Sequence, residues 1–390
     1  MDVLTSHSKE TGTVETRALP TSAFLARTNP PDGQVATEGR SVQDVIACSP
    51  VKWLGVSGGL GVVALVTFMV CLGFGTEAIS FPQVASLLIQ GMVAEGGAQD
   101  NTQSIILWQV RVPRVLLAFM VGGSLAAVGA SLQALLRNPL ADPYVIGISS
   151  GAALGAAVAI LFGVGLSVFG LSVLPFCAFL GALVSLFIVY RIAVSYRSFS
   201  IHTLLLGGVV LNAIFSALIL FLTSLADPYK ASGMYAWLMG SLTGPDFKTV
   251  SILAVYLVLG VGVLVSQARS LNLLTLGEEA ARSLGVEVER VKRVIFAASA
   301  LLTGSVVAFS GLIGFVGLIV PHAVRLVFGA DHRLLLIASG IVGGTFLMVA
   351  DTVARTLLSP TEIPVGVVTA LVGGPIFLYL LVQQRRRIVS

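Results

Sequence analysis

Long stretches without a charged residue constrain this chain more than any other feature of its sequence. No Asp, Glu, Lys or Arg occurs between Val115 and Leu136, and none occurs between Pro143 and Tyr190. A helix of about 20 apolar residues crosses the roughly 30 Å hydrocarbon core of a bilayer. Charged residues make up only 11% of the chain, whereas soluble domains carry roughly 25%. These runs predict an all-α integral membrane protein.

Breaks in the apolar pattern divide the chain into about ten expected transmembrane helices. The second uncharged run is too long for one crossing, and Gly163, Gly165, Gly170 and Pro175 mark a turn inside it. A Gly-rich bend divides the run before Arg325 in the same way. The expected spans are residues 53–75, 115–136, 144–163, 171–190, 202–225, 250–266, 294–310, 313–328, 334–355 and 364–382.

Two segments do not fit this pattern of crossings. Residues 234–242 are too short to cross, and we expect an interfacial or re-entrant helix with Trp237 at the lipid headgroups. Residues 1–50 are rich in Thr, Ser, Pro, Gly and charge, which predicts a disordered tail. They lack the basic start and apolar core of a signal peptide. Residues 51–390 are expected to form one transmembrane domain.

The positions of the basic residues indicate an orientation. With ten spans, most of them fall on one side, and short loops rich in Lys and Arg mark the cytoplasm. The chain is therefore expected in the cytoplasmic (inner) membrane with both termini in the cytoplasm, and its net charge of +4 does not indicate nucleic-acid binding. The residues on that side are Lys52, Arg137, Arg191, Arg197, the basic residues of 269–293, Arg333 and Arg385–Arg387.

An ordered set of motifs carries a family resemblance. Arg111-Val112-Pro113-Arg114 precedes a Gly- and Ala-rich apolar run, which is followed by Q-x-x-x-R-N-P-L-A-D-P over 133–143 and G-x-S-S-G-A over 147–152. Further motifs occur at 311–325, 330–333, 350–355, 362–366 and 373–377. In this order they resemble the membrane permeases of type II ABC importers, the FecCD family, which take up iron-siderophores, haem and cobalamin. The resemblance covers residues 53–384.

The resemblance implies a coupling element in the charged loop at 276–285. This segment predicts a short amphipathic helix ended by Gly285, with two acidic residues in its first turn, where the helix dipole favours them. On charge alone it could be a solvated loop. In the resembled family this loop sits in a cleft of the ATP-binding subunit. The residues implied are Gly277, Glu278, Glu279, Ala280, Leu284 and Gly285.

Three arginines break the charge rule because they lie at external helix ends. They are Arg111, Arg114 and Arg355. Snorkelling to lipid phosphates is one interpretation. The resemblance implies another, in which they face acidic residues on the two lobes of a substrate-binding protein, and Arg suits this task because its planar fork binds a carboxylate with two hydrogen bonds. We expect binding-protein docking.

Two short segments match the gate segments of the resembled family. Asn138 and Leu140 belong to the inner gate turn, and Ile201 with His202 occupies the second gate segment. Small hydroxyl residues can occupy that second segment in relatives, so Ile201-His202 departs from the pattern. His202 could equally be an interfacial histidine.

Neither a metal site, a catalytic residue nor a cofactor is expected. Cys48, Cys71 and Cys177 show no paired spacing, and His322 has no second ligand at i+4. A Walker A sequence is absent from the chain, so ATP hydrolysis is expected on a separate subunit.

The expected function is that of a permease subunit. It would work as a homodimer with two ATP-binding subunits and a periplasmic or extracellular substrate-binding protein, in contact with membrane lipid. The expected cargo is an iron chelate, either siderophore or haem, and cobalamin is the alternative. An ion-coupled secondary carrier would place ionisable residues at mid-membrane, and an intramembrane hydrolase would need paired catalytic groups there. The sequence favours neither.

Overall fold

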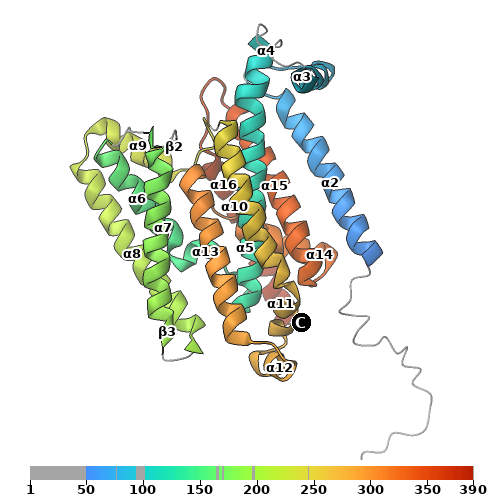
Figure 1. The fold of residues 1–390 in the computed structure, drawn as a ribbon, viewed down its shortest axis with the longest axis vertical. Helices are drawn as coiled ribbons and strands as arrows, with labels where there is room; N and C mark the ends of the chain where they lie inside the picture. The colour runs from blue at the N-terminus through green and yellow to red at the C-terminus, as the bar shows by residue number, and fades with distance from the viewer. Residues whose placement is uncertain are drawn as a thin grey trace, which may run out of the picture. The chain divides into compact units, whose positions relative to one another are not determined.

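The computed structural model describes residues 50–75, 77–93, 102–163, 167–168, 171–195, 198–244 and 246–389. These residues are almost wholly helical, as the apolar runs predict (Figure 1). The tail expected over residues 1–50 lies outside the described residues, apart from Pro50.

The helices follow one another along the chain with short connections. They are α2 (Pro50–Gly73), α3 (Phe81–Val93), α4 (Thr102–Ile105), the π-helix η2 (Ile106–Arg111), α5 (Val112–Leu135), the 3₁₀ helix η3 (Pro143–Ile146), α6 (Ile148–Leu161), α7 (Val173–Ala193), α8 (Ile201–Leu225), α9 (Pro228–Leu238), α10 (Phe247–Ser266), α11 (Ala268–Thr275), α12 (Glu278–Ser283), α13 (Val288–Ser310), α14 (Val316–Phe328), α15 (His332–Thr356) and α16 (Val365–Val389). In the described chain, 7 helices are long and apolar enough to cross a membrane, and shorter apolar stretches lie in α6, α14 and α16. The prediction of about ten transmembrane helices is confirmed.

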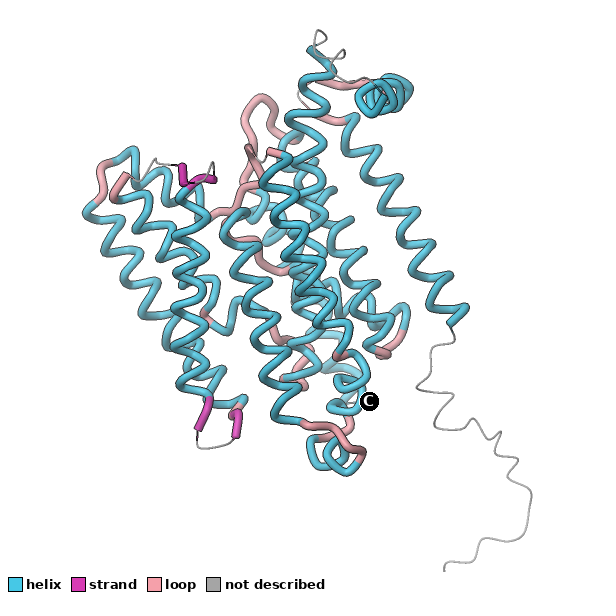
Figure 2. Tube along the Cα trace, viewed as in Figure 1, coloured by secondary structure: helices cyan, strands magenta, loops and turns pink. Residues whose placement is uncertain are grey.

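Two hairpins of very short strands flank α7, which the sequence did not predict. β1 (Ser167–Val168) pairs antiparallel with β2 (Leu171–Ser172), and β3 (Val194–Ser195) pairs antiparallel with β4 (Ser198–Phe199). Figure 2 shows the hairpins at opposite ends of the bundle. We call the end that carries α3, α4 and α9 the α9 end, and the end that carries α12 and the second hairpin the α12 end (Figure 1).

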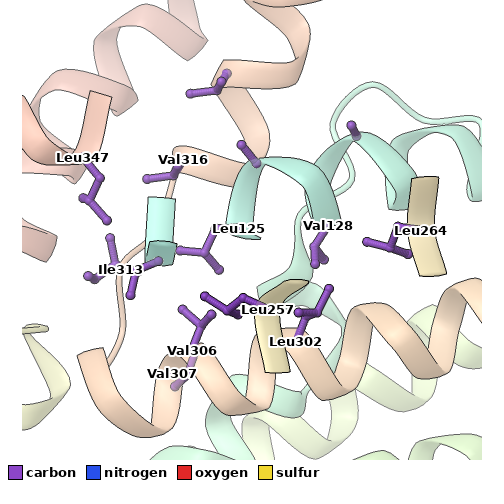
Figure 3. Packing of buried hydrophobic residues seen from close by; sticks show 14 of the residues in the cluster. Leu125, Val128, Leu257, Leu264, Leu302, Val306, Val307, Ile313, Val316 and Leu347 are labelled. Carbon is purple, nitrogen blue, oxygen red and sulfur yellow. The ribbon is translucent and has the colours of Figure 1, made fainter. Parts of the chain in front are cut away.

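Helix α5 lies at the centre of the bundle and packs against α10, α13, α14 and α15 (Figure 1). Most of its residues are buried, because small and aliphatic side chains occupy its whole circumference. Figure 3 shows part of this core, in which Leu125 of α5, Leu257 of α10 and Val306 of α13 point toward one another. Leu347 of α15 and Val316 of α14 also belong to the core.

Glycines bring α5 into backbone contact with two neighbours. A Cβ atom on Gly122 would collide with the carbonyl oxygen of Gly343 in α15, and one on Gly129 would collide with the carbonyl oxygen of Gly317 in α14. Small residues allow such close approach between membrane helices, where van der Waals packing supplies much of the attraction.

A second glycine contact joins α6 to α7. A Cβ atom on Gly151 would lie 2.6 Å from the carbonyl oxygen of Gly181, and one on Gly155 would collide with the carbonyl oxygen of Cys177. The backbones of these two helices therefore touch over about one helical turn. Glycine-mediated backbone contact thus occurs within two groups of long helices, one containing α5, α14 and α15 and the other containing α6 and α7.

The second expected span begins earlier than the sequence predicts. The sequence predicts a span over residues 115–136, which follows Pro113. The helical chain instead runs without a break from Thr102 to Leu135, and the π-helix η2 ends at Arg111, two residues before the proline. Proline lacks an N–H and its ring conflicts with a carbonyl one turn earlier, and a π-helical turn accommodates that irregularity. The arginine pair therefore lies inside a helix.

The short helix expected over 234–242 is displaced toward the N-terminus. Helix α9 begins at Pro228 because the Asp227 carboxylate accepts hydrogen bonds from the N–H groups of Tyr229 and Lys230. It ends at Leu238, and the following residues are not helical. The prediction that this segment is too short to cross is confirmed, since α9 has 11 residues.

Candidate functional site

Helix α12 and the glycines on either side of it form the loop that the sequence assigns to coupling. Gly277 precedes the helix with φ of 121°, and Gly285 follows it with φ of 85°, a left-handed conformation. The Val286 N–H donates to the Ala281 carbonyl at 3.0 Å, which closes the helix in the way its glycine predicts. The exposed residues of this loop include Glu279, Ala280 and Leu284.

Glu278 connects α12 to two other parts of the chain. Its carboxylate lies 2.8 Å from Lys292 Nζ on α13 and 3.6 Å from Arg137 Nη2 in the turn after α5. The Lys292 side chain is only 5% exposed, so this cation depends on its carboxylate partner. The Arg137 contact is longer and that side chain is 44% exposed, so this pair exchanges easily with water.

Glu289, in the first turn of α13, makes a second connection. One carboxylate oxygen accepts a hydrogen bond from the Phe199 N–H of β4 at 2.8 Å. The other lies 3.5 Å from Lys292 Nζ and 3.6 Å from Arg282 Nη2 on α12. The Lys292 cation therefore lies between two carboxylates, and one of them holds the strand that leads into α8.

The first predicted gate segment is a tight turn after α5. Arg137 has φ of 47°, an unusual value for a residue with a side chain. The Leu140 N–H donates to Asn138 Oδ1 at 2.9 Å, which fixes the turn, and both side chains are exposed. Further on, Asp142 accepts from the Tyr144 N–H at 2.8 Å. Burial outweighs this hydrogen bond and raises the pKa of Asp142 to about 6.

The second predicted gate segment is the first turn of α8. Ser200 caps the helix, because its hydroxyl accepts a hydrogen bond from the Thr203 N–H. Ile201 is partly exposed and His202 is exposed. Phe199, which Glu289 holds, precedes this cap directly. The gating role of the two segments stays a prediction.

Five charged residues thus join the predicted coupling helix to both predicted gate segments, and we call them the α12 network. They are Arg137, Glu278, Arg282, Glu289 and Lys292. Sequence reasoning selected only Glu278 among them. The spacing of Glu289 and Lys292, three apart in the first turns of an amphipathic helix, was a signal for a charge pair. The partners on other helices had no signal in the sequence.

The three arginines near the α9 end form a different arrangement. Arg114 Nε and Nη2 donate to the Asp351 carboxylate at 2.9–3.1 Å, and Arg114 Nη1 donates to the Glu362 carboxylate at 3.0 Å. Arg111 donates to the backbone carbonyls of Leu72, Gly73 and Glu77. Arg355 donates to the Cys71 carbonyl at 2.5 Å. We call these three arginines with Asp351 and Glu362 the arginine cluster.

The arginine cluster is buried, which corrects the expectation that these cations point outward. Arg111 is 3% exposed, Arg114 is 7% exposed and Arg355 is 6% exposed. Snorkelling to lipid phosphates does not fit this burial. Asp351 was the missed signal, because a carboxylate inside a membrane span calls for a cationic partner. Docking of a binding protein on these arginines stays a prediction, and it requires a change in their present partners.

The described residues contain no cluster of three or more His, Cys, Asp or Glu side chains that could hold a metal ion. Cys71 is buried in the bundle, where its thiol lies 3.6 Å from the Met348 carbonyl, and Cys177 is partly buried. Cys48 lies outside the described residues. His322 is partly exposed on α14.

Comparison with known proteins places this arrangement in a family. The model of the FecCD transport family matches residues 63–383. The cobalamin import system permease protein BtuC of Halobacterium salinarum is 48% identical over 72% of this chain and 74% of its own length. The hemin transport system permease protein HmuU of Yersinia pestis is 43% identical over 72% of this chain and 84% of its own length.

A solved structure agrees with this assignment. It is described as an inward-facing conformation of a putative metal-chelate type ABC transporter. It has a TM-score of 0.73 and 35% sequence identity, and the match covers 84% of this chain and 99% of that one. The fold class and the resemblance read from the sequence are therefore confirmed. This chain is a multi-pass membrane protein that belongs to the FecCD transport family of permeases.

Proposed function

We propose that this chain is the transmembrane permease subunit of an ATP-driven importer that moves a metal chelate across the cytoplasmic membrane. The α12 network is the observation that carries the proposal. It connects a helix with an exposed outer face to both segments that would close a substrate path. ATP hydrolysis belongs, in this proposal, to separate ATP-binding subunits that dock on α12.

The α12 end is the cytoplasmic end in this proposal. Arg137, Arg191, Arg269, Arg282 and Arg293 are all on segments at that end, as short cytoplasmic loops require. Helix α2 starts there and the described chain stops there (Figure 1). Both termini would then lie in the cytoplasm.

A homodimer with the substrate path at its two-fold axis fits the position of the gate segments. Both segments have exposed residues, one in the turn after α5 and the other at the start of α8. The exposed face of α8 is aliphatic and carries Leu206, Val210, Ile214 and Leu218. A two-fold axis beside this face would bring the gate residues of two copies together, because a symmetric interface uses the same patch twice.

The coupling step follows from the contacts of the α12 network. A bound ATP-binding subunit that displaces α12 also displaces Glu278, and with it Arg137 and the Asn138 turn. Displacement of α12 moves Arg282 relative to Glu289, which holds the backbone before α8. Both gates then respond to one movement. Contacts of 3.6–3.7 Å between partly exposed groups can break and re-form at low cost.

The cargo proposal is an iron chelate, with haem supported by the similarity to the hemin permease. Cobalamin is the second candidate, and the 48% identical cobalamin permease favours it. Both are metal chelates, in line with the description of the similar solved structure. A secondary carrier is a weaker alternative. Such a carrier would need an ionisable group that is free to bind the coupling ion, whereas Asp351, the fully buried carboxylate of the arginine cluster, is paired with Arg114.

The decisive experiment is uptake into proteoliposomes. The chain is reconstituted with its ATP-binding subunit and its substrate-binding protein, and haem, a ferric siderophore and cobalamin are supplied separately. ATP-dependent uptake of one of them supports the importer and names the cargo. Uptake driven by an ion gradient without the ATP-binding subunit would refute the proposal.

We also propose that the binding protein docks on the arginine cluster and that one of its carboxylates replaces Glu362 as a partner of Arg114. The Glu362 side chain is 42% exposed, whereas Asp351 is 1% exposed, so Glu362 is the exchangeable partner of Arg114. A carboxylate of the binding protein would replace it. Glu362→Gln should then strengthen docking by removing the competitor, and Glu287→Gln on the α12 side is the matched control. Unchanged affinity of Glu362→Gln would argue against docking through Arg114.

A further inference from the structure

A cavity of about 670 Å³ lies inside the single chain, on a face that the proposed transport path does not use. Pockets that hold small molecules measure roughly 300–1,000 Å³. Helices α7, α13 and α10 lie side by side along this face (Figure 1). The cavity lies over α13 between the other two, and its inner wall reaches Leu117 of the central helix α5.

The wall of the cavity is apolar. Phe176 and Phe179 of α7, Trp237 of α9 and Phe309 of α13 supply aromatic surface. The hydroxyls of the two α13 serines that line the cavity are already used within their own helix. Ser305 donates to the Leu301 carbonyl at 2.8 Å, and Ser310 donates to the Val306 carbonyl at 3.0 Å. The inner cavity therefore suits a hydrocarbon.

The mouth of the cavity opens sideways between two membrane helices. Phe176 on α7 and Tyr256 on α10 line the cavity, and they are also 59% and 57% exposed on the outer surface of the bundle. The neighbouring outward residues on the same helices are aliphatic, among them Leu180, Val184 and Leu259. Both helices are candidate membrane spans. The hydrocarbon of the bilayer therefore lies directly in front of the mouth.

One end of the cavity is polar. The connection between α9 and α10 covers it at the α9 end and contributes Ser241, Thr243 and Gly244. The two hydroxyls lie 2.7 Å apart. Thr249, in the first turn of α10, adds a third hydroxyl. Trp237 stands near this polar end, and tryptophan prefers the level of the lipid headgroups.

We propose that this cavity binds one acyl chain of a membrane lipid in the leaflet at the α9 end. The chain enters between Phe176 and Tyr256, lies against Phe309 and reaches Leu117. The polar group of the lipid remains at the connection formed by Ser241 and Thr243. An apolar inner wall, a lateral mouth and a polar end together match an amphiphile that is anchored in a bilayer.

Photocrosslinking of the full-length chain in vesicles tests this proposal. The vesicles contain phosphatidylethanolamine and phosphatidylglycerol, and one acyl chain of the phosphatidylglycerol carries a diazirine. A second arm uses the free fatty acid with the same diazirine. Leu117 is 2% exposed and Ala308 is 1% exposed, so lipid on the outer surface does not reach them. Val62 and Val66 of α2, which are 62% and 56% exposed, report ordinary surface lipid.

We expect adducts on Leu117 and Ala308 in at least one arm, and the arm that gives them identifies the lipid class. Ser305→Leu and Ala236→Leu fill the cavity from two different helices, α13 and α9. Each should lower labelling at Leu117 about tenfold, the loss that follows when roughly two methylene groups are excluded. Labelling at Val62 should not change.

Ala297→Leu is the matched control, because Ala297 is exposed on α13 and lies outside the cavity lining. Two filling variants keep the test decisive if one of them fails to insert. Absence of adducts at Leu117 and Ala308 with both probes would overturn the proposal. Equal labelling of these residues in the filled and unfilled chains would overturn it as well.

Discussion

The arginine cluster and the α12 network both tie distant helices together with charges, but they do so in opposite ways. Arg114 and Asp351 are buried, and their hydrogen bonds measure 2.9–3.1 Å. In the α12 network only Lys292 is buried, and most ion pairs measure 3.5–3.7 Å. The first set joins α5 to α15 with fixed geometry. The second joins α12 to its neighbours with contacts that exchange.

This difference shows what burial does to a charge pair. A buried pair gains little net stability over apolar residues, but loss of one partner leaves a charge without compensation. An exposed pair contributes from nothing to about 1 kcal/mol, so it can open and close. The α9 end is therefore built to keep its helices in register. The α12 end is built to pass on a displacement.

The largest expected effect comes from breaking the buried pair. Arg114→Met leaves Asp351 with only Arg355, whose Nε lies 3.9 Å away. We expect the free energy of unfolding to fall by about 3–5 kcal/mol, measured by denaturation of the purified chain in detergent. The double variant Arg114→Gln with Asp351→Asn keeps a hydrogen bond without charge and should recover most of the loss. A single variant as stable as the unaltered chain would show that the cluster is not a structural tie.

Asp142 sharpens the comparison, because it is a largely buried carboxylate in the connection between α5 and α6. Burial raises its pKa from 3.8 to about 6, so the folded chain binds the proton more tightly than the unfolded chain does. Its stability contribution is present below pH 4 and is lost as the pH rises through 6. Asp142→Asn should stabilise the chain at pH 7 by about 2–3 kcal/mol and flatten the pH profile of unfolding between pH 4 and 6. If the Asp142→Asn variant keeps the slope of the unaltered chain between pH 4 and 6, Asp142 is not the source of that slope.

Glu278→Gln tests whether the exposed network transmits movement. The buried Lys292 keeps Glu289 at 3.5 Å, so the variant should fold. We expect uptake per ATP hydrolysed to fall about tenfold, equivalent to roughly 1.4 kcal/mol, measured in proteoliposomes that contain the complete importer. Glu287→Gln is the control, since that pair with Arg290 is exposed on both sides. If the two variants show equal uptake per ATP hydrolysed, Glu278 does not transmit the movement of α12 to the gate segments.

Arg282→Gln should have the smallest effect. Its side chain is 56% exposed, and its Nη2 lies 3.6–3.7 Å from the carboxylates of Glu278 and Glu289. We expect a change in unfolding free energy below about 1 kcal/mol and a loss of coupling smaller than that of Glu278→Gln. Uptake and ATP hydrolysis measured together at low and high salt check this, because salt screens exposed pairs. If Arg282→Gln lowers uptake per ATP hydrolysed as much as Glu278→Gln does, Arg282 is as important as Glu278 for transmitting the movement of α12.

The sequence predicted the helices well because each span is a long apolar run with clear breaks. The left-handed turn at Gly285 was also predictable, since glycine tolerates positive φ after a helix. The family followed from the order of the motifs. These features depend on residues close together in the chain, and local patterns are what a single sequence shows directly.

The pairing of distant charges was not predictable in the same way. Arg114 and Asp351 are separated by 237 positions, and Glu289 and Phe199 by 90. Nothing local says which of several arginines meets a given carboxylate. The predicted start of the second span was wrong for a related reason. Pro113 normally begins or breaks a helix, and only the packed bundle decides that the helix continues through it.

The glycine contacts set the mechanical character of the subunit. Where Gly129 meets Gly317 and where Gly151 meets Gly181, the backbones touch, so rotating one helix drives a side chain into the other backbone. Each group of helices is therefore stiff, and motion is cheapest along the seam between them, where α13 lies. In mechanical terms, α12 is a short lever attached to the end of that seam. A push on α12 is expected to tilt one stiff group against the other and to leave both unbent.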